Sequence, residues 1–274
     1  MSNPLLIQTR AALLDAVEAL GRHSDQVVVI GAQAVHLRTG DADVALAEST
    51  KDADLALDPR CLEDDPLIHD ALTSAGFELE GGNPGQWLSP GGIPVDLLLP
   101  SELSGRNPKR RSVRIPPHSD NVARNTRGIE GCVIDYEEMF VPALDPDDGR
   151  VCRVKVAGAA GLLVAKLIKI GERAETPHRL IDKDAHDSYR LLVATPTESM
   201  ASRLAILAKT DISADVTNEA LEHLADLFAE GAEALGSMMA GRAEEGVGEP
   251  ATVAASVSVL AADLLGQLKD LRRT

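Results

Sequence analysis

The stretches VVVIGAQAVHL at residues 27–37 and TKDADLAL at residues 50–57 are the most informative about the fold. Four apolar residues in a row before Gly31 predict a short buried strand, and the residues from Ala32 onward predict a helix directly after it. The second stretch alternates in polarity, which is typical of a half-buried strand. Its two faces carry Ala53, Leu55 and Leu57 on one side and Thr50, Asp52 and Asp54 on the other.

The two carboxylates of this strand, Asp52 and Asp54, lie about 7 Å apart along one face. Adjacent anions repel each other unless a cation lies between them or solvent screens them. Magnesium accepts carboxylate oxygens and leaves room for phosphates, so the pair indicates either a metal site or a solvated strand face. A dinucleotide-binding fingerprint is disfavoured, because Gln33 and His36 stand where it requires glycines.

A third carboxylate, Asp96, lies within the apolar stretch IPVDLLL at residues 93–99. An unpaired buried carboxylate is costly, so we expect Asp96 at an open edge, in an ion pair or on a metal. If its strand neighbours the strand of Asp52, three carboxylates converge. That arrangement suits magnesium acting on a phosphoryl group.

Composition limits the class of protein. The chain has 274 residues, 44% apolar and 26% charged, which excludes wholesale disorder and collagen. Only 2% of the residues are aromatic, so an aliphatic core is expected. Three cysteines without a C-x-x-C motif favour a reducing cytoplasm, with thiols as small core residues. We find no apolar run of about 18 residues and therefore expect no membrane span.

The pattern along the chain predicts an α+β protein with an all-helical C-terminal half. We expect an α+β domain at residues 1–157 and a helical domain at residues 158–274. Elements expected beyond the motifs include helices at 61–75 and 218–239 and a strand at 133–136.

Two further motifs lie on expected helices of the second half. Lys166 shares the apolar face of its helix with Leu163 and Leu167, so it either reaches solvent from the rim or is held in a cleft for phosphate oxygens. Asp184 and Asp187 share a helix face at i, i+3, which by itself is typical of a solvated helix start.

Charge is spread unevenly. The chain carries a net charge of -16, yet residues 104–128, here called the basic strip, contain seven cations and one anion. A basic region on an acidic protein accepts a polyanion locally. The residues that we expect to contact RNA there are Arg106, Lys109, Arg110, Arg111 and Arg114.

The order of these motifs resembles the nucleotidyltransferase fold: strand–Gly31–helix, then Thr50-x-Asp52-x-Asp54, then Asp96 in an apolar strand. The later Lys166 helix, followed by Arg173 and by Lys183-Asp184-x-x-Asp187, resembles one branch of it. That branch comprises the AbiEii-type toxins, including the Men-type tRNA-modifying toxins. The resemblance spans about residues 25–195.

The resemblance implies a mixed sheet with flanking helices and a role for each motif. Asp52 and Asp54 would be catalytic and bind magnesium with the phosphates of an NTP, and Asp96 would be a third metal ligand. Gly31 and Ala32 would lie beside the triphosphate, and Thr50 marks the position of a hydroxyl that is phosphorylated in some silenced relatives. Lys166 would contact phosphate, and Asp187 would be the late essential carboxylate, with Asp184 as the alternative.

The expected function is therefore metal-dependent transfer of NMP from NTP to RNA, with tRNA as the expected acceptor. The chain would be the toxin of a toxin–antitoxin or abortive-infection system, with a cognate antitoxin as its partner. Two alternatives are a nucleotidyltransferase with a small-molecule or protein acceptor, and a nucleotide-binding protein without activity.

Overall fold

The computed structural model describes residues 4–40, 51–105, 110–271 and 273. It divides into two compact units. The first comprises Met1–Ala34 and Ser49–Ala157, and the second comprises Val35–Glu48 and Gly158–Thr274. The division therefore falls within helix α2 (Gly31–Thr39), whereas the sequence-based boundary places all of that helix in the first domain.

The first unit is built on a mixed sheet. Among the described residues it has eight strands in the order β3-β4-β5-β2-β1-β8-β7, with β6 paired to β5 off this path. The strands are β1 (Val27–Ile30), β2 (Ala53–Leu57), β3 (Glu78–Leu79), β4 (Gln86–Leu88), β5 (Pro94–Pro100), β6 (Arg124–Thr126), β7 (Tyr136–Pro142) and β8 (Val151–Ala157). The predicted α+β class with a mixed sheet is confirmed.

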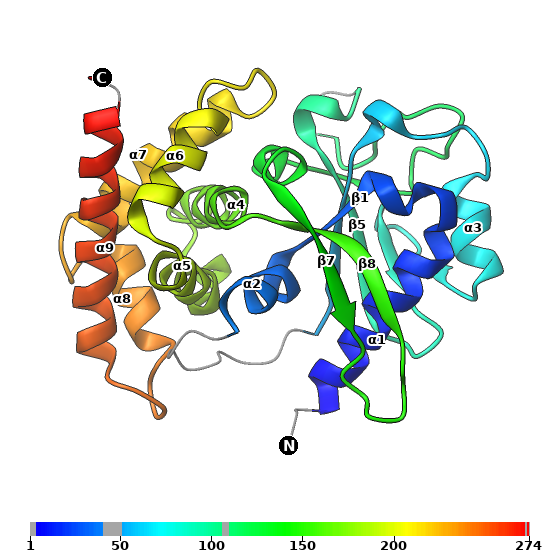
Figure 1. The fold of residues 1–274 in the computed structure, drawn as a ribbon, viewed down its shortest axis with the longest axis horizontal. Helices are drawn as coiled ribbons and strands as arrows, with labels where there is room; N and C mark the ends of the chain where they lie inside the picture. The colour runs from blue at the N-terminus through cyan, green and yellow to red at the C-terminus, as the bar shows by residue number, and fades with distance from the viewer. Residues whose placement is uncertain (1–3, 41–50, 106–109, 272, 274) are drawn as a thin grey trace. The chain divides into compact units, whose positions relative to one another are not determined.

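The interior strands of this sheet explain the sequence pattern. All four residues of β1 are buried, because β1 lies between β2 and β8. Strand β2 runs antiparallel to β1 and parallel to β5. Helix α1 (Pro4–Leu20) packs against β2, β5 and β8 and against helix α3 (Ile68–Ser74), as Figure 1 shows.

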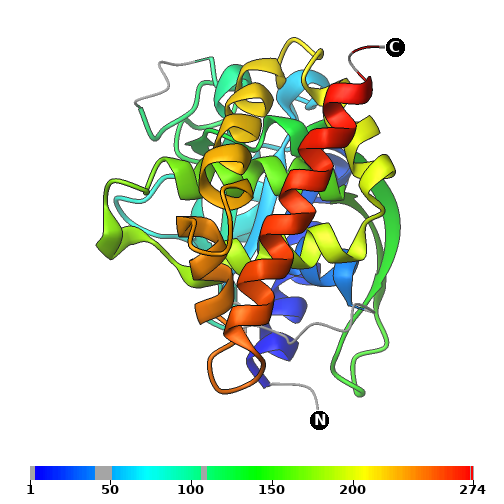
Figure 2. The same cartoon turned by 90° about the vertical axis from the view of Figure 1, so that its left-hand side faces the viewer.

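The second unit is helical, as predicted. Its helices are α4 (Ala159–Gly171), α5 (Asp182–Ala194), α6 (Thr197–Leu207), α7 (Ala214–Leu224), α8 (Leu235–Arg242) and α9 (Pro250–Leu271). Helix α9 runs lengthwise across this unit beside α6 and α8 (Figure 2). It is long and apolar enough to cross a membrane by length and composition alone. Within the unit it buries one face, which includes Val257, Ala261 and Leu264, as a core helix does.

Several expected elements are wrong in their bounds. The strand expected at 50–57 begins only at Ala53, and four of its five residues are buried, because β2 lies between β1 and β5. The expected strand at 133–136 does not form as such: a 3-10 turn at Glu130–Val133 covers its first residue, and the strand β7 begins only at Tyr136. Glu130 holds this turn, since its buried carboxylate accepts hydrogen bonds from the backbone N–H groups of Ser101 and Gly128. Strand β7 forms because it pairs with β8 over seven residues, a contact that its own sequence does not indicate, because its polar and apolar residues do not alternate.

The expected helix at 218–239 is divided. Helix α7 ends at Leu224, a π-helical turn follows at Ala225–Ala229, and α8 begins at Leu235. Gly231 lies between them with a φ of 120°, a conformation that ends a helix and that glycine adopts without strain. The helix expected at 61–75 is shorter for a similar reason, because Pro66 precedes α3 and a proline disfavours helix at the residue before it.

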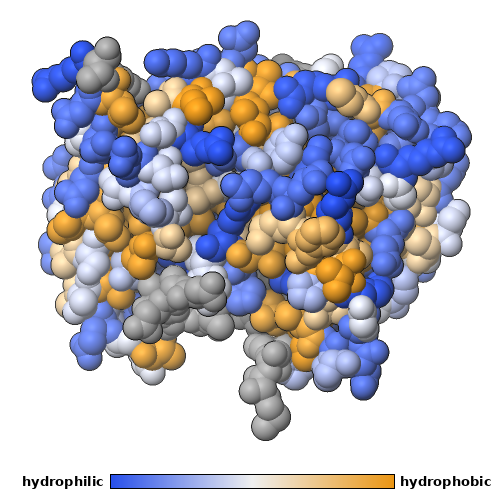
Figure 3. Space-filling view, in the orientation of Figure 1, coloured by the Kyte–Doolittle hydropathy of each residue, from blue (hydrophilic) through white to orange (hydrophobic). Residues whose placement is uncertain are grey.

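Some apolar side chains and one cysteine of the first unit are exposed to solvent. Apolar residues gather on the visible face of β7 and β8 in Figure 3, where Phe140 is 73% exposed and Val151 58% exposed. Of the three cysteines, Cys132 is buried but Cys61 is exposed, so the expectation that all the thiols are core residues is wrong.

Candidate active site

The turn from β1 into α2 places the backbone of Gly31 against the carboxylate of Asp54. Gly31 has a φ of 65°, which glycine adopts readily and which strains other residues. A Cβ at this position would collide with Oδ2 of Asp54. Both the backbone conformation and the space therefore require glycine, and the Asp54 carboxylate lies directly over the start of α2.

The strand register aligns Asp54 with the third predicted carboxylate. Asp54 on β2 is the Cα partner of Ile30 on β1 and of Asp96 on β5. Paired residues on neighbouring strands point to the same face of a sheet, so Asp54 and Asp96 lie side by side next to Gly31. Their convergence was expected only if the two strands were neighbours, and β2 and β5 are neighbours.

Asp96 is held by Arg124, which in the sequence is one of the cations of the basic strip. Nη2 of Arg124 donates to Oδ2 of Asp96 at 2.6 Å. The other oxygen, Oδ1, is buried without a hydrogen-bond partner. Burial raises the pKa of Asp96, and the opposing effect of Arg124 does not cancel the rise.

Asp52 lies one residue before β2 and is half-buried. Its charge is near enough to contribute to the raised pKa of Asp96. Within the described ranges, no three His, Cys, Asp or Glu side chains are arranged to hold a metal ion. The three aspartates thus share one region of the sheet, but their side chains do not form a complete ligand set.

The described part of the basic strip runs beside this region. Arg110, Arg111 and Arg114 are exposed. The backbone carbonyl of Arg111 accepts a hydrogen bond from the backbone N–H of Asn125 on β6, and the positive charge of Arg111 lowers the pKa of Asp96 slightly against the effect of burial. Thr50, Arg106 and Lys109 lie outside the described residues, and Ala32 is the half-buried second residue of α2.

The second unit holds a separate ionic cluster, built on α4 and α5. Nζ of Lys166 donates to Asp187 Oδ2 at 2.7 Å and to Asp184 Oδ1 at 2.9 Å. All three residues are more than 90% buried. The interpretation of Asp184 and Asp187 as a solvated helix start is therefore wrong. The alternative that Lys166 reaches solvent from the rim of its helix is wrong for the same reason.

Two more cations complete the ionic cluster. Nζ of Lys169 lies 2.9 Å from Asp184 Oδ1, and Nη1 of Arg173 lies 3.7 Å from Asp184 Oδ2. Burial by itself raises the pKa of Asp184, but Lys166 and Lys169 outweigh it and lower that pKa to about 2. Burial likewise opposes the charged form of Lys166, yet the two carboxylates raise its pKa above the ordinary lysine value.

Several residues of the second unit were not predicted from the sequence. Lys169 could have been found, because it is three residues from Lys166 and such residues share a helix face. Arg190 binds Thr39 at the end of α2, and His186 Nε2 lies 2.6 Å from Glu244 Oε1. Both pairs join residues more than 50 positions apart, and no local pattern predicts such contacts.

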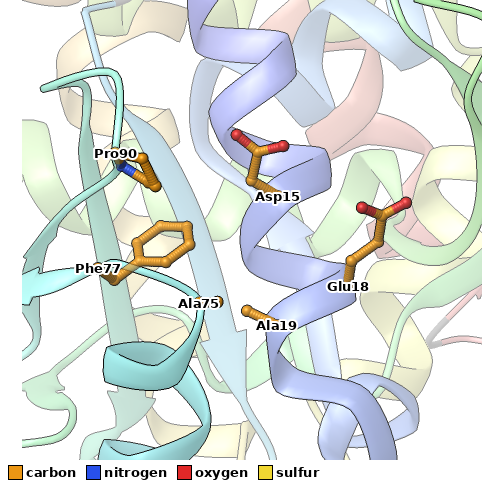
Figure 4. Close-up of a pocket in the computed structure, with 6 residues that line it drawn as sticks. All are labelled: Asp15, Glu18, Ala19, Ala75, Phe77 and Pro90. Carbon is orange, nitrogen blue, oxygen red and sulfur yellow. The ribbon is translucent and has the colours of Figure 1, made fainter.

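A pocket of about 450 Å³ lies elsewhere in the first unit. Figure 4 shows Asp15 and Glu18 on α1 and Phe77 and Pro90 on the opposite side, with Ala19 and Ala75 between them. Arg150 already binds both carboxylates. None of the expected site residues lines this pocket.

Comparison with known proteins identifies the class. Residues 8–219 match the family described as Nucleotidyltransferase, and the chain belongs to that family. A comparison with curated proteins finds no match. A solved structure described as "Crystal structure of putative nucleotidyltransferase from H. pylori" aligns with 98% of this chain and 99% of its own at 10% identity, with a TM-score of 0.32.

We predict that Gly31→Ala destabilises the protein by more than about 2 kcal/mol, since left-handed strain of about 1–2 kcal/mol adds to the collision with Asp54. Gly82→Ala is the matched control, because Gly82 has a φ of 86° and open space around it. Urea unfolding measures both. The double variant Gly31→Ala/Asp54→Ala should recover the part due to the collision, and strictly additive destabilisation would contradict the contact.

We predict that Asp184 supports stability at neutral pH and that this support declines in acid. Its pKa is about 2 in the folded protein, below the ordinary value of 3.8, so the contribution is present above pH 4 and declines as pH falls toward 2. Between pH 5 and pH 3 the decline is on the order of 1 kcal/mol. Urea unfolding should show this part of the acid slope in the wild type and in Asp182→Asn but not in Asp184→Asn. An unchanged slope in Asp184→Asn would refute the coupling.

Proposed function

We propose that this nucleotidyltransferase is metal-dependent and transfers NMP from an NTP to a hydroxyl of RNA, with tRNA as the acceptor. The observation that carries the proposal is the Asp54 carboxylate packed onto Gly31, with Asp96 in register beside it. A carboxylate and a helix start at the same point suit a magnesium–triphosphate ligand, because helix N-termini attract phosphate and carboxylates attract magnesium.

The aspartates present supply part of the ligand set of a magnesium ion. Oδ1 of Asp96 is buried without a partner, and an atom of that kind needs a ligand or a proton. Asp52 and Asp54 would hold the ion, with Asp96 as the third candidate. Magnesium typically takes one or two carboxylates and completes its shell with water and substrate phosphates. When bound, it would stabilise the charge of the attacking and leaving oxygens.

The chain's own residues would position the substrates, accept the proton and bind the nucleotide. The backbone at Gly31 and Ala32 would position the triphosphate for in-line attack by the acceptor hydroxyl on the α-phosphorus, with pyrophosphate as the leaving group. Asp96 suits acceptance of the hydroxyl proton, because burial raises its pKa toward the working pH. Asp187 is the alternative acceptor of this proton. For Lys166 and Asp184 we propose nucleotide binding, with Lys169 and Arg173 as the more exposed cations of the ionic cluster.

RNA is favoured as the acceptor by the basic strip. Its described cations Arg110, Arg111 and Arg114 are exposed on the segment that runs beside β6, and β6 pairs with the Asp96 strand. A toxin of the AbiEii type, with a cognate antitoxin as its partner, is the biological role that we propose; it rests on the resemblance of the motifs.

We predict that α-labelled NTP transfers label to a tRNA-sized band of total RNA in the presence of magnesium. Asp52→Ala and Asp54→Ala should each lower the rate at least about 1,000-fold, since metal stabilisation of phosphoryl transfer is worth several kcal/mol. Asp25→Asn is the control, because Asp25 is exposed in the same unit. Label on a small molecule or a protein instead of RNA would overturn the acceptor, and no Asp54-dependent NTP consumption would overturn the activity.

We also predict that Arg111→Gln/Arg114→Gln weakens RNA binding and reduces the slope of log affinity against log salt by about 0.7–0.9 for each phosphate that the strip no longer binds. NTP affinity should stay the same. The matched control is Arg22→Gln/Arg153→Gln, which removes two exposed cations from elsewhere in the unit. Equal effects of the two double variants on the slope would mean that the basic strip is not the RNA site.

A further inference from the structure

The starting observation is the ion pair between Asp96 and Arg124. The side chain of Asp96 is 10% exposed, whereas that of Arg124 is 25% exposed. The pair therefore joins a buried carboxylate to a cation that solvent reaches. Arg124 begins β6 and is the Cα partner of Leu98, two residues beyond Asp96 on β5.

The ion pair is asymmetric. Oδ2 of Asp96 accepts from Arg124 Nη2, while Oδ1 is buried without a partner. Arg124 thus provides the main compensation of this buried negative charge, since Arg111 acts on Asp96 only through its longer-range charge. A guanidinium has five N–H donors, so Arg124 can bind a second anion with the rest of its fork.

The chain around Arg124 is the basic strip itself. Ser112 forms an isolated antiparallel bridge with Arg124, and the side chain of Asn125 donates to the backbone carbonyl of Arg110. The backbone carbonyls of the exposed residues Arg110 and Arg111 are therefore both hydrogen-bonded to Asn125, the neighbour of Arg124 on β6. A phosphate on this surface has Arg124 as a neighbouring cation.

From these contacts we infer that Arg124 is a positioning residue shared between Asp96 and a phosphate of the RNA acceptor. With the strip empty, Arg124 neutralises Asp96 and occupies Oδ2. An RNA phosphate on the strip competes for the guanidinium and releases Oδ2 for the nucleotide site. Binding of the RNA acceptor thereby frees an oxygen of the third carboxylate, Asp96. This inference rests on the proposed function and deepens it, because it adds a control by the acceptor.

Thermodynamic reciprocity makes the inference measurable without catalysis. If RNA and Asp96 compete for Arg124, removal of the Asp96 charge must tighten RNA binding by the same coupling. That gain must disappear when Arg124 is absent. A general electrostatic effect of Asp96 on RNA would instead persist in both backgrounds, so a double-mutant cycle separates the two.

The experiment measures binding of a fluorescein-labelled tRNA transcript to the full chain by anisotropy, with EDTA and without NTP. We expect Asp96→Asn to tighten binding about 3- to 10-fold in the wild-type background and less than about 1.5-fold in the Arg124→Gln background. Asp120→Asn, which removes the one anion of the basic strip, is the control and should have equal effects in both backgrounds. Equal effects of Asp96→Asn in both backgrounds would overturn the inference.

A second variant leaves Asp96 intact, so it tests the inference even if Asp96→Asn does not fold. Arg124→Lys keeps the charge but replaces the fork by a single ammonium, so RNA affinity should fall more than with the matched Arg114→Lys. Equal affinities of these two variants would also overturn the inference. If labelled NMP enters RNA while the cycle is additive, the sharing of Arg124 fails and the proposed function stands. If the chain shows no salt-dependent RNA binding, both the sharing and the RNA acceptor fail.

Discussion

The contact between Gly31 and Asp54 sets the geometry of the first unit around the candidate site. Strand β1 passes directly into α2 at a positive φ, and the Asp54 carboxylate fills the space of the absent Cβ. Any larger residue would displace either the helix start or the carboxylate. The same contact brings the negative charge of Asp54 to the N-terminus of α2, where the helix dipole stabilises a negative charge. The carboxylate there can attract a metal cation, and the helix N-terminus can attract the phosphate bound to that cation.

Buried charge is compensated differently in the two units. In the first, Asp96 pairs with Arg124 and keeps an unpartnered oxygen. In the second, Lys166 lies between Asp184 and Asp187. Burial of two charges removes both from water, and this desolvation can cost more free energy than their mutual attraction returns. Both groups are therefore costly to maintain for stability alone, and this cost is consistent with a role in binding.

Local patterns predicted much of the fold. Strand β1 was predicted at its observed bounds because four buried residues in a row have few alternatives. Strand β7 was missed, since its pairing partner β8 and not its own composition makes it a strand. The division of the expected helix near Gly231 depends on a backbone conformation that a lone glycine in a helical pattern does not indicate. Arg124 was counted with the basic strip, because its carboxylate partner lies 28 residues away.

The types and the order of the chemical groups follow from the sequence alone: a glycine after a buried strand, two aspartates at the start of the next strand, one aspartate in an apolar strand, and a lysine before two more carboxylates. Periodicity and composition are local, and they suffice for this. Which of the groups meet is a matter of tertiary structure. The register of β2 against β5 aligns Asp54 with Asp96, and β6 brings Arg124 to that carboxylate. Strand pairing and burial join distant residues, and no local spacing specifies them.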